Sequence, residues 1–277
     1  MTSGYSSAVN TAREYYNSDD ADNFYSLVWG GEDIHIGLYE KEGDAIRDAS
    51  HRTVRHMANK LALDGNSTVL DVGSGYGGAA RYLAEANGCR VTALNLSEKE
   101  NERARQLNAE RKLDTRIDVV DGSFEKIPCA DAQFDAVWSQ DAILHSGQRE
   151  QVIAEVARVL KPGGIFIFTD PMQSDGCPAD VLQPILNRIH LSSLGSPEFY
   201  RRCCAENGLQ EVEFEEMTQQ LVNHYSRVLE ETEKHEQALS DRISPEYVQR
   251  MKQGLGHWIS GGNNGYLAWG IFVFKKP

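Results

Sequence analysis

A glycine-rich turn preceded by a carboxylate is the clearest chemical feature of the chain. The turn reads GSGYGG at residues 73–78, and the spacing of Gly73, Gly75 and Gly78 satisfies the G-x-G-x-x-G pattern of dinucleotide sites. Asp71 stands two residues before the first glycine. A carboxylate there would repel a pyrophosphate but would attract a cation such as an ammonium or a sulfonium. The turn is therefore predicted to hold a cationic ligand, the alternative being glycines that serve only a tight turn.

The elements that must position this turn alternate between strands and helices. Hydrophobic periodicity predicts helices at residues 45–62, 77–87 and 152–160, a further helix from Ser97, and strands at residues 68–72, 90–95, 117–120, 134–138 and 165–169. This alternation is typical of a parallel sheet with right-handed crossovers and helices on both faces. Ligands in such sheets bind beyond the carboxyl ends of the strands, which is where the glycine turn lies.

The second half of the chain departs from this rhythm. A helix is predicted to begin at Ser196-Pro197 and a strand to lie near residues 212–214, followed by a polar, helix-favouring stretch at about 218–262. The last apolar run, residues 266–274, is predicted as one continuous strand in the buried middle of a sheet.

Composition and charge exclude several classes of protein. Lys and Arg number 28 against 41 Asp and Glu, and the formal net charge of −13 would repel nucleic acid. No apolar run approaches the roughly 18 residues of a membrane span, and the first residues lack the features of a signal peptide. The five cysteines are scattered without Cys-x-x-Cys spacing, which fits reduced thiols better than disulfides or a zinc site. The expectation is a cytoplasmic protein that binds no nucleic acid, no membrane and no metal.

Several motifs resemble those of the class I S-adenosylmethionine-dependent methyltransferases. The segment VLDVGSGYG at residues 69–77 is similar to the first motif of that family, and DGSF at residues 121–124 to its segment around the adenine. Residues 134–138 resemble its fourth strand, and VLKPGG at residues 159–164 resembles its turn into strand five. The resemblance implies an α/β fold: a Rossmann-like, seven-stranded sheet, mostly parallel with the last strand antiparallel, with helices on both faces and an inserted helical lid.

The ligand implied by this resemblance is S-adenosylmethionine, the methyl donor. Asn95 departs from the family pattern, in which Asp or Glu usually ends the second strand and holds the ribose hydroxyls. An amide also accepts and donates hydrogen bonds, so Asn95 is interpreted as a ribose contact, or else as a residue that merely ends the strand. The residues expected to contact the donor are Asp71, Gly73, Ser74, Gly75, Asn95, Leu96, Asp121, Gly122, Ser123 and Gln140.

Segments outside these motifs extend the resemblance over nearly the whole chain. Residues 24–37, 138–146, 169–173, 220–228 and 265–270 together resemble the sarcosine/dimethylglycine N-methyltransferases. This resemblance implies methylation of sarcosine and then dimethylglycine to glycine betaine, with S-adenosylhomocysteine as by-product. It also implies a single domain at 1–277, divided into an N-terminal helical cap (1–66), a donor-binding core (67–170) and an acceptor-side half (171–277) with the helical insert at about 218–262.

His145 is the candidate for the reacting site. Methyl transfer to an amine needs a free lone pair, yet an alkylammonium with a pKa of about 10 is almost fully protonated at pH 7. The pocket must therefore favour the uncharged amine or accept its proton. His145 follows Trp138 by seven residues, in the segment that leaves the fourth strand at the ligand edge. Helix capping or packing is the alternative role for this histidine.

Further candidates for the acceptor pocket are aromatic or charged. Aromatic faces bind quaternary ammonium groups, and Tyr25 and Trp29 lie in a segment that could fold over the ligand edge. Asp141 could attract a substrate ammonium or could cap the helix that follows it. Asn223 and Tyr225 in the insert carry donors for a substrate carboxylate, unless they belong to the polar face of an amphipathic helix.

A corner after the fifth strand is predicted to favour methylated amines. Pro171 removes a backbone donor there, and Met172 presents a soft apolar wall. The alternative is that both residues only turn the chain away from the strand.

Three other activities fit parts of the pattern. The chain could methylate another small amine or a lipid, although its negative charge opposes binding to anionic membranes. It could bind S-adenosylmethionine without turnover, or it could be a dehydrogenase that uses the G-x-G-x-x-G turn. An isotope assay for methyl transfer separates an enzyme from a sensor, and a binding test with a nicotinamide cofactor addresses the dehydrogenase.

Overall fold

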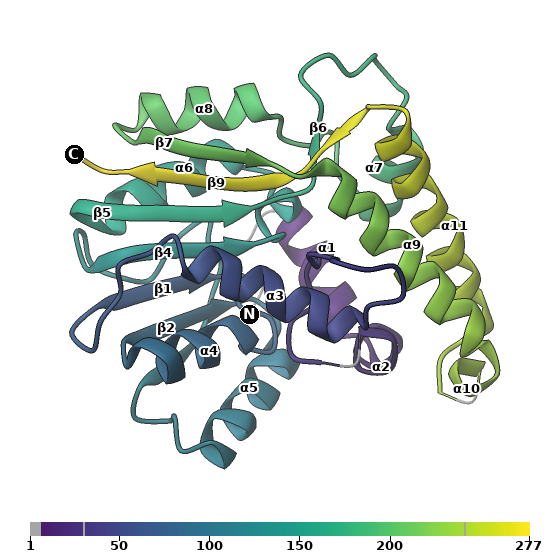
Figure 1. Cartoon of the computed structure of the whole chain (residues 1–277), viewed down its shortest axis with the longest axis horizontal. Coiled ribbons are helices and arrows are strands. Elements are labelled where there is room, and N and C mark those ends of the chain that lie inside the picture. The colour runs from purple at the N-terminus through teal and green to yellow at the C-terminus, as the bar shows by residue number, and fades with distance from the viewer. Residues whose placement is uncertain (1–6, 30, 241) are drawn as a thin grey trace.

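A seven-stranded sheet forms the centre of the molecule, whose computed structural model describes residues 7–29, 31–240 and 242–277 (Figure 1). The strands are β1 (Thr68–Val72), β2 (Arg90–Asn95), β3 (Ile117–Asp121), β4 (Phe134–Gln140), β5 (Leu160–Thr169), β7 (Gln210–Glu216) and β9 (Gly270–Lys275). Their order is β3-β2-β1-β4-β5-β9-β7. The first five are parallel, whereas β9 runs antiparallel to both of its neighbours. The predicted fold class is confirmed.

Helices cover both faces of this sheet because its strands are apolar on both sides. One face carries α3 (Ile46–Ala58) and α4 (Gly78–Asn87), and the other carries α6 (Arg149–Val159) and α8 (Pro197–Glu206). In β1, Val69 belongs to the core cluster of the first face, whereas Leu70 and Val72 belong to the cluster of the second. This is the alternation that a strand imposes on successive side chains. A further helix, α5 (Glu98–Glu110), packs beside β2 and β3.

A helical insert stands at the carboxyl ends of β4 and β5 (Figure 1). Its helices are α9 (Thr218–Lys234), α10 (Glu236–Ser240) and α11 (Pro245–Asn263), and α9 packs along α11. Pro245 occupies the first turn of α11, where a missing N–H is harmless. A short helix that the sequence pattern did not predict, α7 (Gln183–Ile189), packs against α11 from the side of the sheet.

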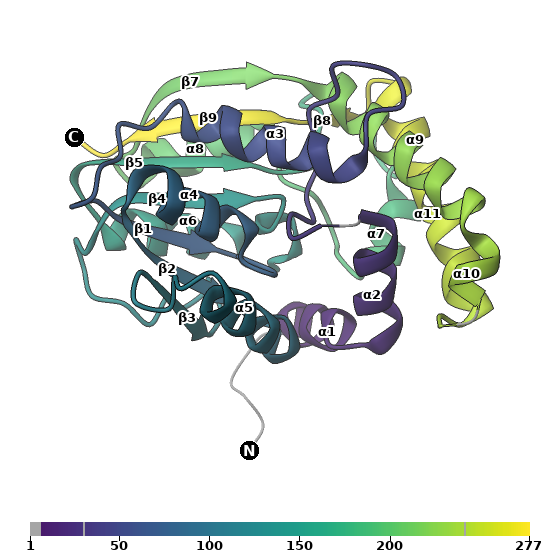
Figure 2. The ribbon, with the colours of Figure 1, turned by 60° about the horizontal axis from the view of Figure 1, so that its bottom comes forward.

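The N-terminal segment lies between α5 and this insert (Figure 2). Its helix α1 (Ser7–Tyr16) is held at the start of α5 by an ion pair of Arg13 with Glu98. Asn17 accepts a hydrogen bond of 2.7 Å from the hydroxyl of Ser97, the residue that caps α5. The following α2 (Asp19–Phe24) and the five-residue π-helix η1 (Tyr25–Trp29) share an apolar cluster with α11.

The last strand differs from the prediction. The run at 266–274 is not continuous: β8 (Leu267–Ala268) pairs with β6 (Met172–Gln173) in a separate two-stranded sheet, and only β9 joins the main one. Trp269 separates them because its backbone bonds to the start of α9. Its N–H donates to Thr218 Oγ1 at 3.0 Å, and its carbonyl accepts from Met217 N at 2.8 Å.

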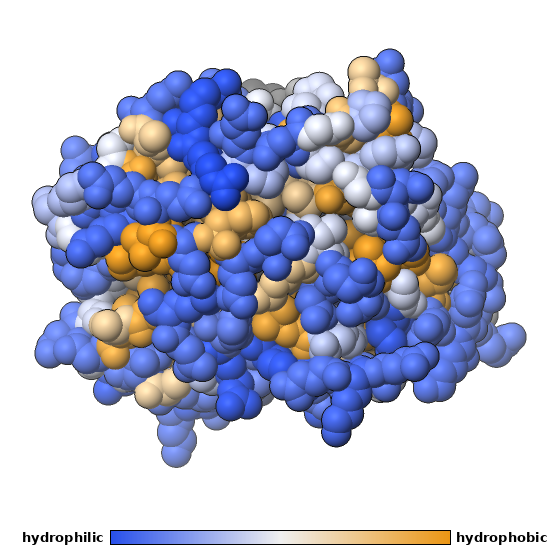
Figure 3. Space-filling model, turned by 45° about the horizontal axis from the view of Figure 1, so that its top comes forward, coloured by the Kyte–Doolittle hydropathy of each residue, from blue (hydrophilic) through white to orange (hydrophobic). Residues whose placement is uncertain are grey.

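The face of the molecule drawn in Figure 3 is mostly hydrophilic, with scattered apolar areas. Among the described residues, the only large hydrophobic side chains classed as exposed are Leu27, Val181 and Val212. No helix in the described part of the chain is long and apolar enough to cross a membrane.

Candidate active site

The glycine turn connects β1 to α4 in a conformation that side chains would obstruct. Gly73, Gly75 and Gly77 have φ angles of +78°, +50° and +78°, in the left-handed region that favours glycine. A Cβ at Gly73 would overlap the Cβ of Ala142, the second residue after the end of β4. The N–H of Gly73 also donates to Leu94 O on β2 at 2.8 Å. The turn therefore lies against the carboxyl ends of both strands that flank β1.

A small cavity of about 30 Å³ lies at this turn. The segment Glu32 to His35 covers it, and Gln140 at the end of β4 closes one side. Gln140 is fixed by a hydrogen bond of 3.0 Å from Trp138 Nε1. Within the described chain, Asp71 Oδ2 and Ser74 Oγ are buried without a hydrogen-bond partner. Buried polar atoms without partners are costly, so these two atoms suit a ligand that brings its own donors.

The Asp71 carboxyl has an unusual environment. Its burial raises its pKa to about 7, and the charge of Asp33 adds to this while that of His35 opposes it. A cation in the cavity would favour the ionised form. This site therefore fits the ammonium or sulfonium that the sequence predicts.

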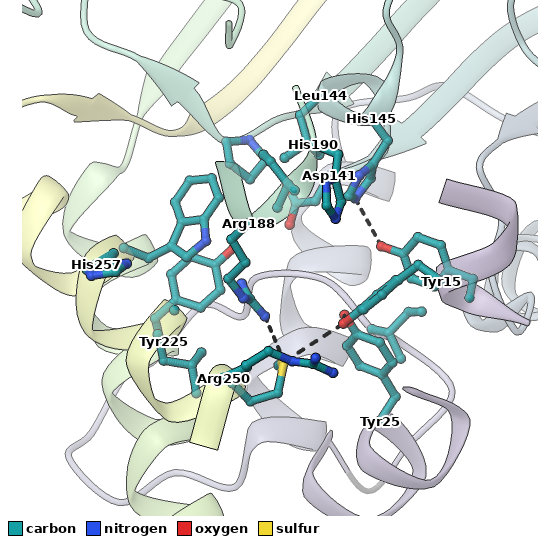
Figure 4. Close-up of a pocket in the computed structure, with 18 of the residues that line it drawn as sticks. Tyr15, Tyr25, Asp141, Leu144, His145, Arg188, His190, Tyr225, Arg250 and His257 are labelled. Atoms are coloured by element: carbon teal, nitrogen blue, oxygen red, sulfur yellow. Dashed lines mark hydrogen bonds between the residues drawn. The ribbon is translucent and has the colours of Figure 1, made fainter. Parts of the chain in front are cut away.

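A second and much larger cavity, of about 1420 Å³, opens beside the first (Figure 4). Its walls come from α1, η1, the ends of β4 and β5, α7, α9 and α11. Ile34 and His35 border both cavities. A ligand at the glycine turn would therefore face a ligand in the large cavity across these two residues.

His145 projects into the large cavity from a short 3₁₀ helix, η2 (Ile143–His145) (Figure 4). Its Nε2 lies 3.0 Å from the hydroxyl of Tyr16 on α1. Burial lowers the pKa of His145 to about 4, and the charge of Arg188 adds to the lowering. The imidazole is therefore neutral at pH 7. Asp170 fixes η2 from behind, since its Oδ1 accepts from Leu144 N at 2.9 Å.

Asp141 ties distant segments together at the boundary of the two cavities. Its Oδ2 accepts from Ile36 N at 2.7 Å, and its Oδ1 accepts from Thr169 Oγ1 at 2.7 Å and Trp269 Nε1 at 2.8 Å. Burial raises the pKa of this carboxyl. The alternative capping role for Asp141 is wrong, because its carboxylate bonds to Ile36, Thr169 and Trp269 and not to the backbone of η2. Neighbouring His35 is also buried, which alone would lower its pKa, but the nearby Asp33 carboxylate, with Oδ1 3.8 Å from His35 Nε2, raises it overall.

Aromatic rings form much of the large cavity's wall. Tyr25 and Trp29 lie with ring centroids 5.0 Å apart. The hydroxyl of Tyr15 is 2.9 Å from that of Tyr247 and 3.4 Å from that of Tyr25. Such a wall suits an ammonium that carries methyl groups in place of N–H donors. In the described part of the chain, no group of three or more His, Cys, Asp or Glu side chains is arranged to hold a metal ion.

Comparisons with known proteins identify the family of the chain. The profile of the family described as "Methyltransferase domain" matches residues 70–168. A sarcosine/dimethylglycine N-methyltransferase of Halorhodospira halochloris is 57% identical over 270 residues, covering 97% of both chains, and one of Aphanothece halophytica is 54% identical, covering 96% of both. The crystal structure of a candidate sarcosine dimethylglycine methyltransferase from Galdieria sulphuraria superposes with a TM-score of 0.91 at 45% identity, covering 95% of this chain and 98% of that one.

The chain belongs to the sarcosine/dimethylglycine N-methyltransferases. The residues that are expected to contact the methyl donor lie at one edge of its sheet. Asp71, Gly73, Ser74, Gly75 and Gln140 line the small cavity.

The other five expected donor residues of the N-methyltransferase lie at the ends of β2 and β3 and line neither cavity. Asn95 and Asp121 are register partners, and Leu96, Gly122 and Ser123 follow them. The Asn95 amide donates to the Glu100 carboxylate at 2.9 Å, so a carboxylate is present at this strand end although it is not part of the strand.

Two expected acceptor residues of the N-methyltransferase lie outside the cavity, and these predictions are wrong. Pro171 lines the cavity, but Met172 is fully buried in the core between the sheet and α8, because successive residues of an extended chain face opposite sides. Tyr225 also lines the cavity, whereas Asn223 bonds to Gln219 and Gln220 of the same helix and does not line the cavity. Residues two apart on a helix do not share a face.

Several cavity residues of the N-methyltransferase were missed by the sequence analysis. Tyr15, Tyr16 and Tyr247 line it, as does Arg188 on α7. The adjacent aromatic pair at positions 15 and 16 on a predicted helical cap was a signal that could have indicated the first two. Arg188 lay in a segment for which no helix was predicted.

Proposed function

We propose that the enzyme transfers the methyl group of S-adenosylmethionine to the nitrogen of sarcosine and then of dimethylglycine, which yields glycine betaine. The observation that carries the proposal is the pairing of two cavities across Ile34 and His35, one with a buried carboxylate at a glycine turn and one with aromatic walls. The relatives named above support the same amines. Mass spectrometry of the products from glycine, sarcosine and dimethylglycine tests it, and the absence of betaine from dimethylglycine would contradict it.

The residues of the small cavity would hold the donor. Asp71 offers a carboxylate to a cationic group, and the side-chain-free turn at Gly73 and Gly75 lets backbone N–H groups approach a ligand. Asn95, Leu96, Asp121, Gly122 and Ser123 would hold the ribose and adenine, with Glu100 beside Asn95. S-adenosylmethionine supplies an electrophilic methyl group on a sulfonium.

The residues of the large cavity would prepare the acceptor. Before attack the substrate ammonium must lose a proton, so that its nitrogen lone pair forms the new N–C bond while the C–S bond breaks. His145, neutral and in contact with the Tyr16 hydroxyl, is placed to accept a hydrogen bond from the ammonium and to relay its proton to solvent; with a pKa of about 4 it does not stay protonated at pH 7. Tyr25 and Trp29 would then face the methylated nitrogen, which ends positively charged.

Proton release should accompany donor binding. Burial raises the pKa of Asp71 from its ordinary 3.8 to about 7. At pH 6 the donor-free protein therefore keeps Asp71 protonated, whereas an ordinary aspartate would be ionised. Because the unfolded chain loses this proton at a lower pH than the folded protein, burial of Asp71 makes the folded state progressively less stable as the pH rises from about 4 to about 7. A cationic donor favours the carboxylate, so calorimetry at pH 6 in buffers of different ionisation enthalpy should detect a released proton.

Asp71→Asn is expected to remove this proton release and to weaken donor binding by at least about tenfold. Asp170→Asn is the matched control, because burial also raises the pKa of Asp170 to about 7 but that carboxyl bonds to Tyr200 and Leu144 away from the turn. Equal proton release in parent and Asp71→Asn would contradict the assignment.

Activity should survive removal of metal ions. The proposed reaction requires the protein only to position the donor and the amine and to remove a proton. We expect the parent rate after dialysis against EDTA, with a donor-to-product assay as the measurement. A loss of rate that added divalent metal restores would overturn this expectation.

We further infer that the reaction takes place in the cytoplasm and involves neither nucleic acid nor a membrane. All five cysteines are free, which suits a reducing compartment, and the net charge of −13 disfavours polyanions.

A further inference from the structure

Arg188 is a cation in the large cavity that has no acidic partner among the described residues. It comes from α7, and its guanidinium points between Tyr225 and α11 (Figure 4). Its Nη2 lies 2.7 Å from the Met251 sulfur, which is a weak acceptor. No carboxylate of the described chain forms an ion pair with it, whereas Arg81 pairs with Glu32 in the same structure. In a protein with a net charge of −13, such a guanidinium is available to an anionic ligand.

The position of Arg188 is central to the cavity. Burial lowers the pKa of His145, and the Arg188 charge lowers it further. Burial raises the pKa values of Tyr225 and Tyr247, and the Arg188 charge opposes both shifts. The guanidinium thus acts on groups from η2, α9 and α11, which enclose the space where the amine must bind.

A glycine in α11 makes room for this side chain. A Cβ at Gly254 would lie 2.5 Å from Arg188 Cδ and 2.7 Å from its Cζ, so any other residue would displace the guanidinium. Glycine inside a helix costs about 1 kcal/mol relative to alanine. Gly254 does not have the positive φ that would otherwise explain it. Gly254 therefore leaves the space in which the Arg188 side chain lies against the cavity wall.

We propose that Arg188 binds the carboxylate of the substrate and makes the enzyme specific for N-methylated amino acids over amines that lack a carboxylate. The inference rests on the function proposed above. A planar guanidinium matches a carboxylate with two parallel hydrogen bonds. The same charge repels the ammonium end of the substrate, which orients the nitrogen away from α7 and towards the boundary with the small cavity.

Other polar residues near the cavity are less suited to bind the substrate carboxylate. Asn223 does not line the cavity, and Arg227 on the same helix is neutralised by Glu230 and Glu231, with the Glu231 contact at 2.8 Å. Arg250 also lines the cavity, but it is exposed and its guanidinium lies 6.0 Å from the Tyr247 ring centroid.

The test compares Arg188→Gln and Arg188→Lys with the parent, using dimethylglycine and 2-dimethylaminoethanol, which has no carboxylate. We expect Arg188→Gln to raise KM for dimethylglycine by about 100-fold, since loss of one member of a buried charge pair has effects of that order. Arg188→Lys should recover part of this loss. The affinity for S-adenosylmethionine should stay unchanged, and the preference for dimethylglycine over 2-dimethylaminoethanol should largely disappear.

Two alanine variants in α11 provide a matched pair. Gly254→Ala should raise KM for dimethylglycine because it displaces the guanidinium, and it keeps the inference testable if Arg188→Gln fails to fold. Gly256→Ala should leave KM unchanged, since a Cβ there meets nothing within 4 Å. Arg227→Gln should likewise leave KM unchanged.

The possible failures are distinguishable. A parent enzyme that makes betaine, together with an Arg188→Gln variant of parental KM and parental preference, overturns the role of Arg188 and leaves the proposed function intact. A parent that methylates neither sarcosine nor dimethylglycine overturns both.

Discussion

Gly75→Asp should abolish binding of S-adenosylmethionine, with an affinity loss of more than about 100-fold. Gly75 has a φ of +50°, and a Cβ there would already contact Ile34 Cδ1 at 3.4 Å across the small cavity. An aspartate would fill the space left for the ligand and would add a second carboxylate near Asp71, whose pKa burial raises to about 7. Like charges in a buried site disfavour ionisation, so neither carboxyl would serve the donor well. Isothermal calorimetry with the donor measures the effect.

The matched control for Gly75→Asp is Gly163→Asp. Gly163 has a φ of +81° and open space around its Cβ, so an aspartate there suffers comparable backbone strain far from the glycine turn. It should bind the donor with parental affinity. Gly75→Asn separates bulk from charge. Parental affinity in Gly75→Asp would remove this turn from the donor site.

His145→Gln should lower turnover of dimethylglycine by about 100-fold or more, within the range that a positioned acid or base contributes. Glutamine preserves a polar contact to Tyr16, but it does not accept a proton near neutral pH. The affinity for S-adenosylmethionine should not change, because His145 borders only the large cavity. The remaining activity would depend on amine that has lost its proton in solution, so it should rise close to tenfold per pH unit between pH 7 and 9.

The control histidine is His56, which lies outside both cavities and 2.8 Å from Glu215. His56→Gln should keep the parental rate and the parental pH profile. If His145→Gln has unchanged turnover, His145 takes no part in the reaction and only packs against its neighbours. A lower rate in Tyr16→Phe, with unchanged donor affinity, would indicate that Tyr16 and His145 act together in removing the proton from the amine.

Local patterns predicted the donor side of the site well. The strand at 68–72, the glycine turn and Asp71 are contiguous in sequence, and a strand that ends in such a turn must place it at the sheet's carboxyl edge. The capping residue Ser97 was also predictable, and its hydroxyl accepts from Glu100 N as expected of a helix start. In such cases the residues that define a feature are near neighbours in the chain.

The acceptor side depends on contacts between segments that are distant in sequence. The cavity brings Tyr16, His145, Arg188 and Tyr247 together from four helices, and no periodicity in any one of them indicates the others. Errors there have simple geometric causes. Met172 was misplaced because one residue in an extended chain reverses the side that a side chain faces.

The attachment of the N-terminal segment to α5 depends in part on charged contacts that salt screens. Arg13 pairs with Glu98 and Lys99 pairs with Asp19 at the surface, where ion pairs contribute little to stability. Salt at about 1 M shortens the screening length to about 3 Å and weakens them, while the apolar sheet keeps its packing. In a more saline medium the N-terminal segment would then be held mainly by uncharged contacts, such as those of Asn17 with Ser97 and of Tyr16 with His145.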